Sequence, residues 1–291
     1  MKLSELLKQD KLSISFEIFP PKTDTAFENV AEAAKAISKL MPAFISVTYG
    51  AGGGTSKYTL EIAKSIEQNY GVPTLAHLTC VSSTKETVAQ RIEDMKNAGI
   101  KNVMALRGDI PAEMQNDDRS KWHYHYAVDL VRELKNSDAD FCIGGACYPE
   151  IHTESTNQEQ DIAHLKEKVE AGCDFLTTQM FFDNNIYYNF LYRAREAGIY
   201  VPIIPGIMPI TRATQVKNAV KLSGCHMPER FINIVDHFGG DKDAMQQAGI
   251  IYATDQIIDL IANGITNIHV YSMNNSKVAQ GILENLSEIL K

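Results

Sequence analysis

The chain has 291 residues, of which 44% are hydrophobic and 22% are charged, and its formal net charge is −8. This length suits an α/β barrel, which commonly reaches such a size as one domain. The acidic balance argues against a nucleic-acid or anionic-membrane surface, because both require a basic patch.

The cysteines and the N-terminal segment predict a cytoplasmic protein. The five cysteines form no C-x-x-C pair and show no zinc-ligand spacing, so we expect reduced thiols and no metal site. The first residues are too polar for a signal peptide, and no run of about 18 apolar residues could span a membrane. We therefore expect neither a membrane nor a nucleic-acid partner.

Eight short, mostly apolar segments predict strands that are buried on both faces. In chain order these segments are 13–19, 43–50, 73–80, 102–108, 141–148, 174–179, 201–207 and 267–272. Helical periodicity separates them; Phe27, Val30, Ala34, Ile37 and Met41, for example, repeat at a period near 3.6.

Four of the predicted helices end in a small residue followed by a glycine that can turn the chain back, at Gly99, Gly172, Gly198 and Gly264. The stretch 225–241 is the least regular, and we expect it to form an extra loop or helix before the last long helix. The alternation as a whole predicts a closed (β/α)8 TIM barrel, with residues 1–291 forming a single catalytic domain.

Nearly every predicted strand ends in a polar or aromatic residue. These residues are Glu17, Thr48, Tyr49, His77, Arg107, Asp109, Tyr148, Gln179 and Tyr271. In barrel enzymes the catalytic groups lie at the carboxyl ends of the strands, so we expect the active site there.

Glu17 is the candidate general acid. It stands between Phe16 and Ile18, and an apolar environment raises the pKa of a carboxyl group and favours its protonated form. A structural pairing of Glu17 with a neighbouring arginine is the alternative.

Two further patterns could bind a nucleotide-like cofactor. The turn Arg107-Gly108-Asp109 joins a cation suited to phosphate, a glycine and a carboxylate that could accept from a heterocycle, although the spacing alone favours a rim salt bridge. Asp161, His164 and Lys168 share one face of the helix after the fifth strand, where they could bind ribose and pyrophosphate or form an ordinary solvated face. The glycine-rich stretch 50–55 matches neither a Rossmann nor a Walker pattern.

Seven blocks in one order resemble the methylenetetrahydrofolate reductase family, and they span nearly the whole chain. The blocks are Phe16–Lys22, Ser46–Ala51, His77–Cys80, Ala105–Asp109, Ala146–His152, Thr178–Asp183 and Ile204–Pro209. The resemblance is to the bacterial members with a single catalytic domain. The regulatory domain of eukaryotic members has no counterpart in this chain, so inhibition by adenosylmethionine is not expected.

The resemblance implies an FAD-containing barrel of one-carbon metabolism and methionine biosynthesis. Such an enzyme reduces 5,10-methylenetetrahydrofolate to 5-methyltetrahydrofolate with a hydride from NAD(P)H. The nicotinamide cofactor reduces the flavin first, and the folate then takes its place, so the reaction is ping-pong through one shared site. A homo-oligomer is expected, and a redox partner protein is possible.

The resemblance also implies roles for individual residues. Glu17 would be the acid that helps to open the imidazolidine ring, and Asp109, the second catalytic residue, would lie near the flavin and bind the pterin. Gln179, Gln215 and Tyr271 would contact substrate. The FAD would be lined by Thr48, Tyr49, Ala51, His77, Leu106, Arg107, Gly108, Asp109, Tyr126, Ala127, Ala146, Tyr148, His152, Asp161, His164 and Lys168.

Three positions in two segments depart from the family pattern, and other functions stay open. Family members often carry Asn and Arg at the positions of His164 and Glu167, and many carry Arg at the position of Asn275. A Schiff-base aldolase would need a lysine within a strand, and none of the eight segments supplies one. A non-catalytic flavin- or folate-binding subunit, or a reductase that takes its electrons from a partner protein, remains an alternative.

Overall fold

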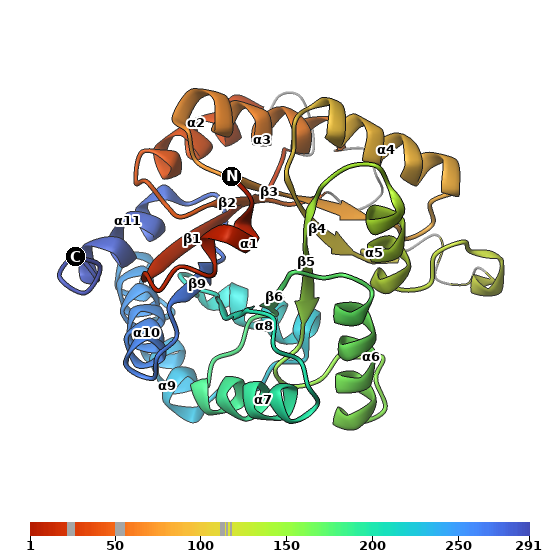
Figure 1. Cartoon of the computed structure of the whole chain (residues 1–291). Helices are drawn as coiled ribbons and strands as arrows, with labels where there is room; N and C mark the ends of the chain where they lie inside the picture. The colour runs from red at the N-terminus through yellow and green to blue at the C-terminus, as the bar shows by residue number, and fades with distance from the viewer. Residues whose placement is uncertain (22–26, 50–55, 111–113, 115, 117) are drawn as a thin grey trace.

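The structure is a computed structural model of the chain. It describes all residues except 22–26, 50–55, 111–113, 115 and 117 (Figure 1). Ala51 and the glycine-rich stretch therefore lie outside the described residues. Within the described part of the chain, no helix has the length and apolar character that a membrane crossing requires.

The described residues form one parallel sheet of nine strands in the order β7-β6-β5-β4-β3-β2-β1-β9-β8. The strands are β1 (Ser13–Ile18), β2 (Ile45–Val47), β3 (Thr74–Thr79), β4 (Asn102–Leu106), β5 (Cys142–Cys147), β6 (Phe175–Thr178), β7 (Ile203–Ile204), β8 (Gly206–Ile207) and β9 (Asn267–Val270). The predicted seventh strand is divided at Pro205, which has no N–H group to donate to a ladder. Its first half pairs with β6 and its second half with β9, so the two short strands together nearly close the barrel that the sequence predicts.

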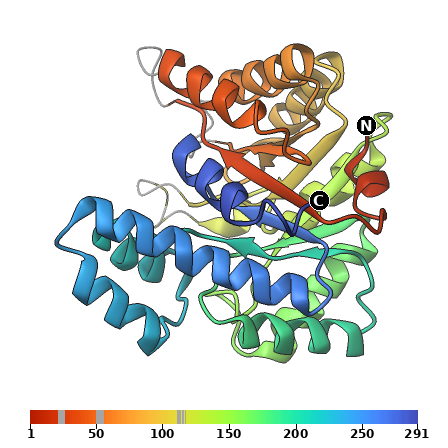
Figure 2. The same ribbon diagram turned by 90° about the vertical axis from the view of Figure 1, so that its left-hand side faces the viewer.

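Helices surround the strands on the outside, as Figure 1 shows along the barrel and Figure 2 from the side. They are α1 (Leu3–Leu6), α2 (Phe27–Ser38), α3 (Ser56–Tyr70), α4 (Lys85–Asn97), α5 (Ala127–Asn136), α6 (Gln158–Glu170), α7 (Asn184–Glu196), α8 (Ala213–Ser223), α9 (Glu229–Phe238), α10 (Lys242–Ala262) and α11 (Ser276–Asn285). The predicted extra helix between residues 225 and 241 is α9. The glycines that end four helices have positive φ, from +77° at Gly99 to +127° at Gly172, as their capping role requires.

Helix α2 is shorter than its apolar periodicity predicts. It ends at Ser38, and Met41, which we expected on the buried face, has a φ of 53° and is 75% exposed. The turn after the helix rotates Met41 away from the core, so including it in the stripe was wrong.

The barrel interior has an apolar floor and a polar layer above it. The floor consists of buried side chains from the strands and the N-terminal segment, namely Leu3, Leu7, Phe44, Leu75, Met104, Cys142, Phe175 and Ile204. Asn102 ties α1 to this floor, because its Oδ1 accepts from Leu3 N at 2.7 Å and its Nδ2 donates to the Thr74 carbonyl at 2.9 Å. His269 of the polar layer stacks on Phe44 of the floor, with 5.6 Å between ring centroids.

Side chains alternate along each strand, and this alternation decides which residues reach the polar layer. On β1, Phe16 and Ile18 belong to the apolar cluster shared with the surrounding helices, whereas Ser15 and Glu17 take the opposite face and contact other strands' polar groups. The polar layer thus lies between this apolar floor and the carboxyl ends of the strands.

Candidate active site

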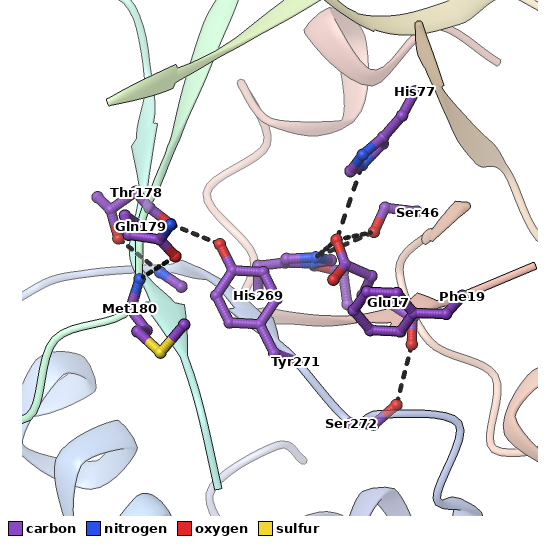
Figure 3. Close-up of polar contacts among 12 residues, drawn as sticks. Glu17, Phe19, Ser46, His77, Thr178, Gln179, Met180, His269, Tyr271 and Ser272 are labelled. Atoms are coloured by element: carbon purple, nitrogen blue, oxygen red, sulfur yellow. Dashed lines mark hydrogen bonds and ion pairs between the residues drawn. The ribbon is translucent and has the colours of Figure 1, made fainter. Parts of the chain in front are cut away.

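Glu17 lies at the centre of the polar layer (Figure 3). It is the second-last residue of β1 and is 6% exposed. The sheet register places it beside Ser46 of β2, whose Oγ lies 3.3 Å from Glu17 Oε2. Two imidazoles also face this oxygen: His77 Nε2 at 3.7 Å and His269 Nε2 at 4.0 Å.

Burial sets the charge of these three groups. It raises the pKa of Glu17 to about 8, and the hydrogen bond from Ser46 offsets this only in part. Burial lowers the pKa of His77 to about 4 and that of His269 to about 3, with the neighbouring His77 adding to the second effect. At neutral pH the centre is therefore a protonated acid among neutral imidazoles, not an ion pair.

A chain of hydroxyl groups links Glu17 to His269. Ser15 Oγ donates to the Ile268 carbonyl at 3.1 Å, so its bond to His269 Nδ1 at 2.8 Å requires the hydrogen to be on Nδ1. His269 Nε2 is then an acceptor, and Ser46 Oγ lies 3.1 Å from it. When Glu17 is protonated it can donate to Ser46, which donates to His269; when Glu17 has lost its proton, Ser46 donates to the carboxylate.

Tyr271 and Gln179 lie beside this centre, where the carboxyl ends of β6 and β9 meet the divided strand. The Tyr271 hydroxyl donates to the Thr178 carbonyl at 2.5 Å, and its ring stands edge-on to His269 at 5.3 Å between centroids. Burial and the nearby Glu17 raise the pKa of Tyr271. Gln179 Oε1 accepts from Met180 N at 3.0 Å, so its amide nitrogen faces elsewhere.

A second group of residues follows β4 and β5. The Arg107 guanidinium pairs with Glu154, and this hydrogen bond lowers the pKa of the Glu154 carboxyl. Tyr148 meets His152 edge-on at 4.6 Å between ring centroids. Burial raises the pKa of Tyr148 to about 12 and lowers that of His152, so both rings are neutral at pH 7.

The turn after β4 requires a glycine. Leu106 ends the strand, and Gly108 has a φ of +89°; a Cβ there would lie 2.9 Å from Cβ of Thr79. Asp109 comes next and is exposed at the rim. The predicted rim salt bridge does exist, but Arg107 forms it with Glu154, not with Asp109.

The three predicted residues of α6 do not behave as a plain solvated face. Asp161 accepts from Ser155 Oγ at 2.9 Å, His164 lies 6.2 Å from the Tyr126 ring, and Lys168 Nζ donates to the Ala146 carbonyl at the end of β5. Ala127 begins α5 directly after Tyr126. The β4, β5 and α6 residues thus form one sector of the rim. Glu167 pairs with Arg132 at 2.6 Å.

The remaining predicted residues lie at other parts of the rim. Thr48 and Tyr49 follow β2, where the Thr48 carbonyl accepts from Thr59 Oγ1 at 2.8 Å and Arg91 lies over the Tyr49 ring at 5.3 Å. Gln215 belongs to α8, and its Oε1 accepts from the amides of Thr211 and Arg212, both at 2.9 Å. His77 is grouped with Glu17, and its buried Nε2 makes no hydrogen bond to any residue that the structure describes.

The sequence reasoning missed Ser15, Ser46 and His269. Ser15 stands two residues before Glu17, and His269 interrupts an otherwise apolar strand two residues before Tyr271, so alternation could have placed both on the inner face. Among the residues that the structure describes, no group of three or more His, Cys, Asp or Glu side chains could hold a metal ion. All five cysteines are free and buried.

The parallel barrel, with a buried acid and polar side chains at its strand ends, defines an α/β-barrel enzyme. The chain belongs to the methylenetetrahydrofolate reductase family, because the family model of that description matches residues 2–287.

Individual relatives agree with this assignment. A 5,10-methylenetetrahydrofolate reductase of Escherichia coli K12 is 34% identical over 278 residues, which cover 96% of this chain and 92% of the relative. Methylenetetrahydrofolate reductase (NADH) 1 of Arabidopsis thaliana is 35% identical over 301 residues, or 99% of this chain and 50% of the relative. The chain thus spans about half the length of the plant relatives that it matches.

Solved structures support the fold. A protein from Clostridium thermocellum, described as binding two copies of 5-methyl-5,6,7,8-tetrahydrofolic acid, superimposes with a TM-score of 0.69 at 16% identity, covering 99% of this chain and 100% of that one. Oxaloacetate acetylhydrolase gives a TM-score of 0.53 at 12% identity, covering 99% and 84%.

Proposed function

We propose that residues 1–291 form one catalytic domain that reduces 5,10-methylenetetrahydrofolate to 5-methyltetrahydrofolate. FAD would mediate the reaction, with NADH or NADPH as hydride donor and both substrates using one site in turn. The observation that supports this best is Glu17, a buried carboxylic acid whose raised pKa keeps its proton at neutral pH. Family membership supplies the substrate class.

The β4, β5 and α6 sector fits FAD. Its two cations, Arg107 and Lys168, suit a pyrophosphate, and Asp161 suits ribose hydroxyls. Among the described residues, the buried His77 Nε2 has no hydrogen-bond partner, so it could bond to the cofactor. When bound, FAD would supply hydride transfer between the nicotinamide and the folate.

Glu17 would supply the proton. Protonation of the substrate's N10 breaks its bond to the methylene carbon and opens the five-membered ring, leaving a positively charged iminium at N5. The methylene carbon accepts the hydride and becomes the methyl group, so one proton and one hydride are consumed. Ser46 would stabilise the carboxylate that Glu17 becomes, because it already lies 3.3 Å from Oε2.

Asp109 and Gln179 would orient the substrates. A pterin carries adjacent N–H groups that a carboxylate at the rim can accept, and Asp109 is the exposed carboxylate that follows β4. The Gln179 side-chain oxygen is already bonded to Met180 N, so its amide NH2 group is what it would present to a substrate.

Anaerobic spectroscopy tests the proposal. Purified protein should be yellow or bind added FAD, NADH or NADPH should bleach the flavin, and methylenetetrahydrofolate should restore its colour. A protein that neither contains nor binds FAD would overturn the assignment. A flavin that folate reoxidises but that neither nicotinamide reduces would favour a reductase supplied by a partner protein.

A further inference from the structure

Four buried polar side chains from three neighbouring strands form one hydrogen-bonded group. Ser15 and Glu17 point to the same face of β1, and the sheet register places Ser15 beside His269 of β9 and Glu17 beside Ser46 of β2. Their exposed fractions lie between 1% and 6%. The hydrogen bonds in this group are made between protein atoms, so a change at one side chain is passed to the next.

The His269 ring is held in one orientation. Its face stacks on Phe44 with 5° between the ring planes, and Tyr271 meets it edge-on. Ser15 Oγ lies 2.8 Å from Nδ1 and gives its own hydrogen to a main-chain carbonyl at 3.1 Å. Ser15 therefore accepts the Nδ1 hydrogen, and Nε2 presents a lone pair to Ser46 Oγ at 3.1 Å.

Ser46 has one hydroxyl hydrogen and two buried acceptors within reach. Its Oγ lies 3.1 Å from His269 Nε2 and 3.3 Å from Glu17 Oε2 (Figure 3). While Glu17 is protonated, it can donate to Ser46 and Ser46 can donate to His269, so both bonds are made. When Glu17 becomes a carboxylate, Ser46 turns its hydrogen to Oε2 and leaves His269 Nε2 without this donor. Because an unsatisfied buried acceptor is costly, the arrangement favours the protonated form of Glu17.

The opposite tautomer of His269 would have the reverse effect. With its hydrogen on Nε2, the ring would donate to Ser46, and Ser46 would donate to Glu17. Both bonds would then point toward the carboxylate and stabilise its negative charge. Ser15 disfavours this tautomer, because it accepts the hydrogen on Nδ1.

The other titratable groups that the structure describes around the Glu17 carboxyl are neutral at pH 7. They are His77 of β3, whose Nε2 lies 3.7 Å from Oε2, and Tyr271. Burial lowers the pKa of His77 to about 4, and burial together with the nearby Glu17 raises the pKa of Tyr271. The choice between acid and carboxylate therefore depends on burial and on the hydrogen bonds of this group.

We propose that Ser15 and Ser46 are positioning residues for the acid Glu17. Ser15 fixes the tautomer of His269, and Ser46 moves its hydrogen bond from His269 to the carboxylate when the acid gives up its proton. The proposal rests on the function proposed above. In the reaction the Glu17 O–H bond breaks and the proton forms an N–H bond at N10 of the folate, whereas the Ser46 hydroxyl only rotates and His269 stays neutral. Once the product has left, the unsatisfied Nε2 favours uptake of a proton from water by Glu17, which restores the acid.

NMR of the full chain, with isotope-labelled side-chain carboxyl groups of glutamate, measures the titration midpoint of Glu17 directly. The signal that is missing from Glu17→Gln identifies the residue. Ser15→Ala should lower the midpoint by about one pH unit, because His269 can then adopt the other tautomer, and Ser46→Ala should raise it by about one unit, because the carboxylate loses its donor. Ser38→Ala is the control and should leave the midpoint unchanged, since Ser38 is equally buried and its hydroxyl bonds to none of the described residues.

Opposite shifts are a result that a general loosening of the interior would not give, because water admitted by either substitution would lower the midpoint in both variants. Any other pattern overturns the proposal. A measurement on the wild type does not depend on whether the variants fold. Nitrogen NMR of the His269 ring should find the hydrogen on Nδ1 between pH 6.5 and 8, and a hydrogen on Nε2 overturns the proposal as well.

The consequence for the reaction is measured separately. The rate of flavin reoxidation by methylenetetrahydrofolate should fall with rising pH, at lower pH in Ser15→Ala and at higher pH in Ser46→Ala than in the wild type. Flavin reduction by NADH should show no such shift. A reoxidation profile that is the same in all three proteins overturns the positioning role. If the carboxyl midpoints shift as expected but the folate does not reoxidise the wild-type flavin, the proposed function fails and the hydrogen-bond assignment stands.

Discussion

Glu17 Oε2 and His77 Nε2 face each other at 3.7 Å inside the barrel, yet burial shifts their pKa values in opposite directions, to about 8 and about 4. The pair is therefore uncharged at neutral pH. Forming the ion pair would require two charges in a space closed from below by apolar side chains, which costs more than the mutual attraction returns. At neutral pH Glu17 therefore keeps its proton, and the neighbouring His77 stays neutral.

The raised pKa of Glu17 predicts a pH dependence of stability. Its ordinary value is 4.5 and its folded value about 8, so its stabilising protonated state is lost as the pH rises toward 8. The two histidines have lowered pKa values, and they change stability only below their ordinary value of 6.5. Between pH 6.5 and 8, only Glu17 among these three groups contributes.

We expect the free energy of unfolding of the wild-type protein to fall over this window by roughly 2 kcal/mol more than that of Glu17→Gln, since one pKa unit corresponds to about 1.4 kcal/mol. Urea denaturation of the FAD-free protein at several pH values measures it. Glu61→Gln, at an exposed position of α3, is the control and should follow the wild type. Parallel curves for wild type and Glu17→Gln would show that Glu17 does not titrate in this range.

Glu154 should weaken FAD binding, because its carboxylate pairs with the Arg107 guanidinium and so competes with an FAD phosphate for that group. Glu154→Gln removes the competing charge, and we expect FAD to bind about two- to tenfold more tightly. Quenching of flavin fluorescence measures the dissociation constant, with Glu159→Gln on the exposed start of α6 as control. Weaker binding in Glu154→Gln would mean that Glu154 positions Arg107 for the cofactor.

The pattern of apolar strands and glycine-capped helices was sufficient to predict the barrel, because both faces of each strand are covered and each return turn needs a positive φ. Alternation also could have shown that Phe16 and Ile18 face away from Glu17. The rise of the Glu17 pKa was predicted correctly, but the prediction attributed it to the wrong neighbours, Phe16 and Ile18. The desolvation comes from the barrel interior, to which β2, β3 and β9 contribute Ser46, His77 and His269.

Pairings between distant segments could not be read from the sequence. Nothing local in Arg107-Gly108-Asp109 indicates that Arg107 pairs with a residue 47 positions away. The division of the seventh strand at Pro205 likewise depends on which neighbour each half meets.

Gly249 should be intolerant of a side chain. It lies inside α10, where a Cβ would come 1.8 Å from the Ile210 carbonyl oxygen. Although alanine favours helices, this clash with backbone should make Gly249→Ala less stable by about 2–4 kcal/mol. Gly240→Ala, which meets nothing within 4 Å, should change the free energy of unfolding by less than about 1 kcal/mol. Equal unfolding midpoints for the two variants would refute the close approach of α10 to residue 210.

Asp109→Asn should affect the folate half-reaction more than the nicotinamide half-reaction. Only the pterin offers paired N–H donors to this exposed carboxylate, and losing a hydrogen bond to a charged group costs about 1.5–3 kcal/mol. We expect the folate concentration for half-maximal flavin reoxidation to rise by about tenfold or more. Equal losses in both half-reactions would assign Asp109 to the flavin or to stability.

The central claim is that Glu17 gives its proton to the folate. Flavin reduction by NADH needs no acid, whereas opening of the imidazolidine ring does, and general acid catalysis contributes about 10²–10⁴-fold. Glu17→Gln keeps the shape of the side chain and removes the transferable proton.

Anaerobic stopped-flow spectroscopy follows each half-reaction separately in the wild type and in Glu17→Gln. The flavin should be bleached by NADH at nearly the same rate in both proteins. Reoxidation by methylenetetrahydrofolate should be at least about 100-fold slower in the variant. If the substitution slows both half-reactions alike, or neither, Glu17 is not the acid.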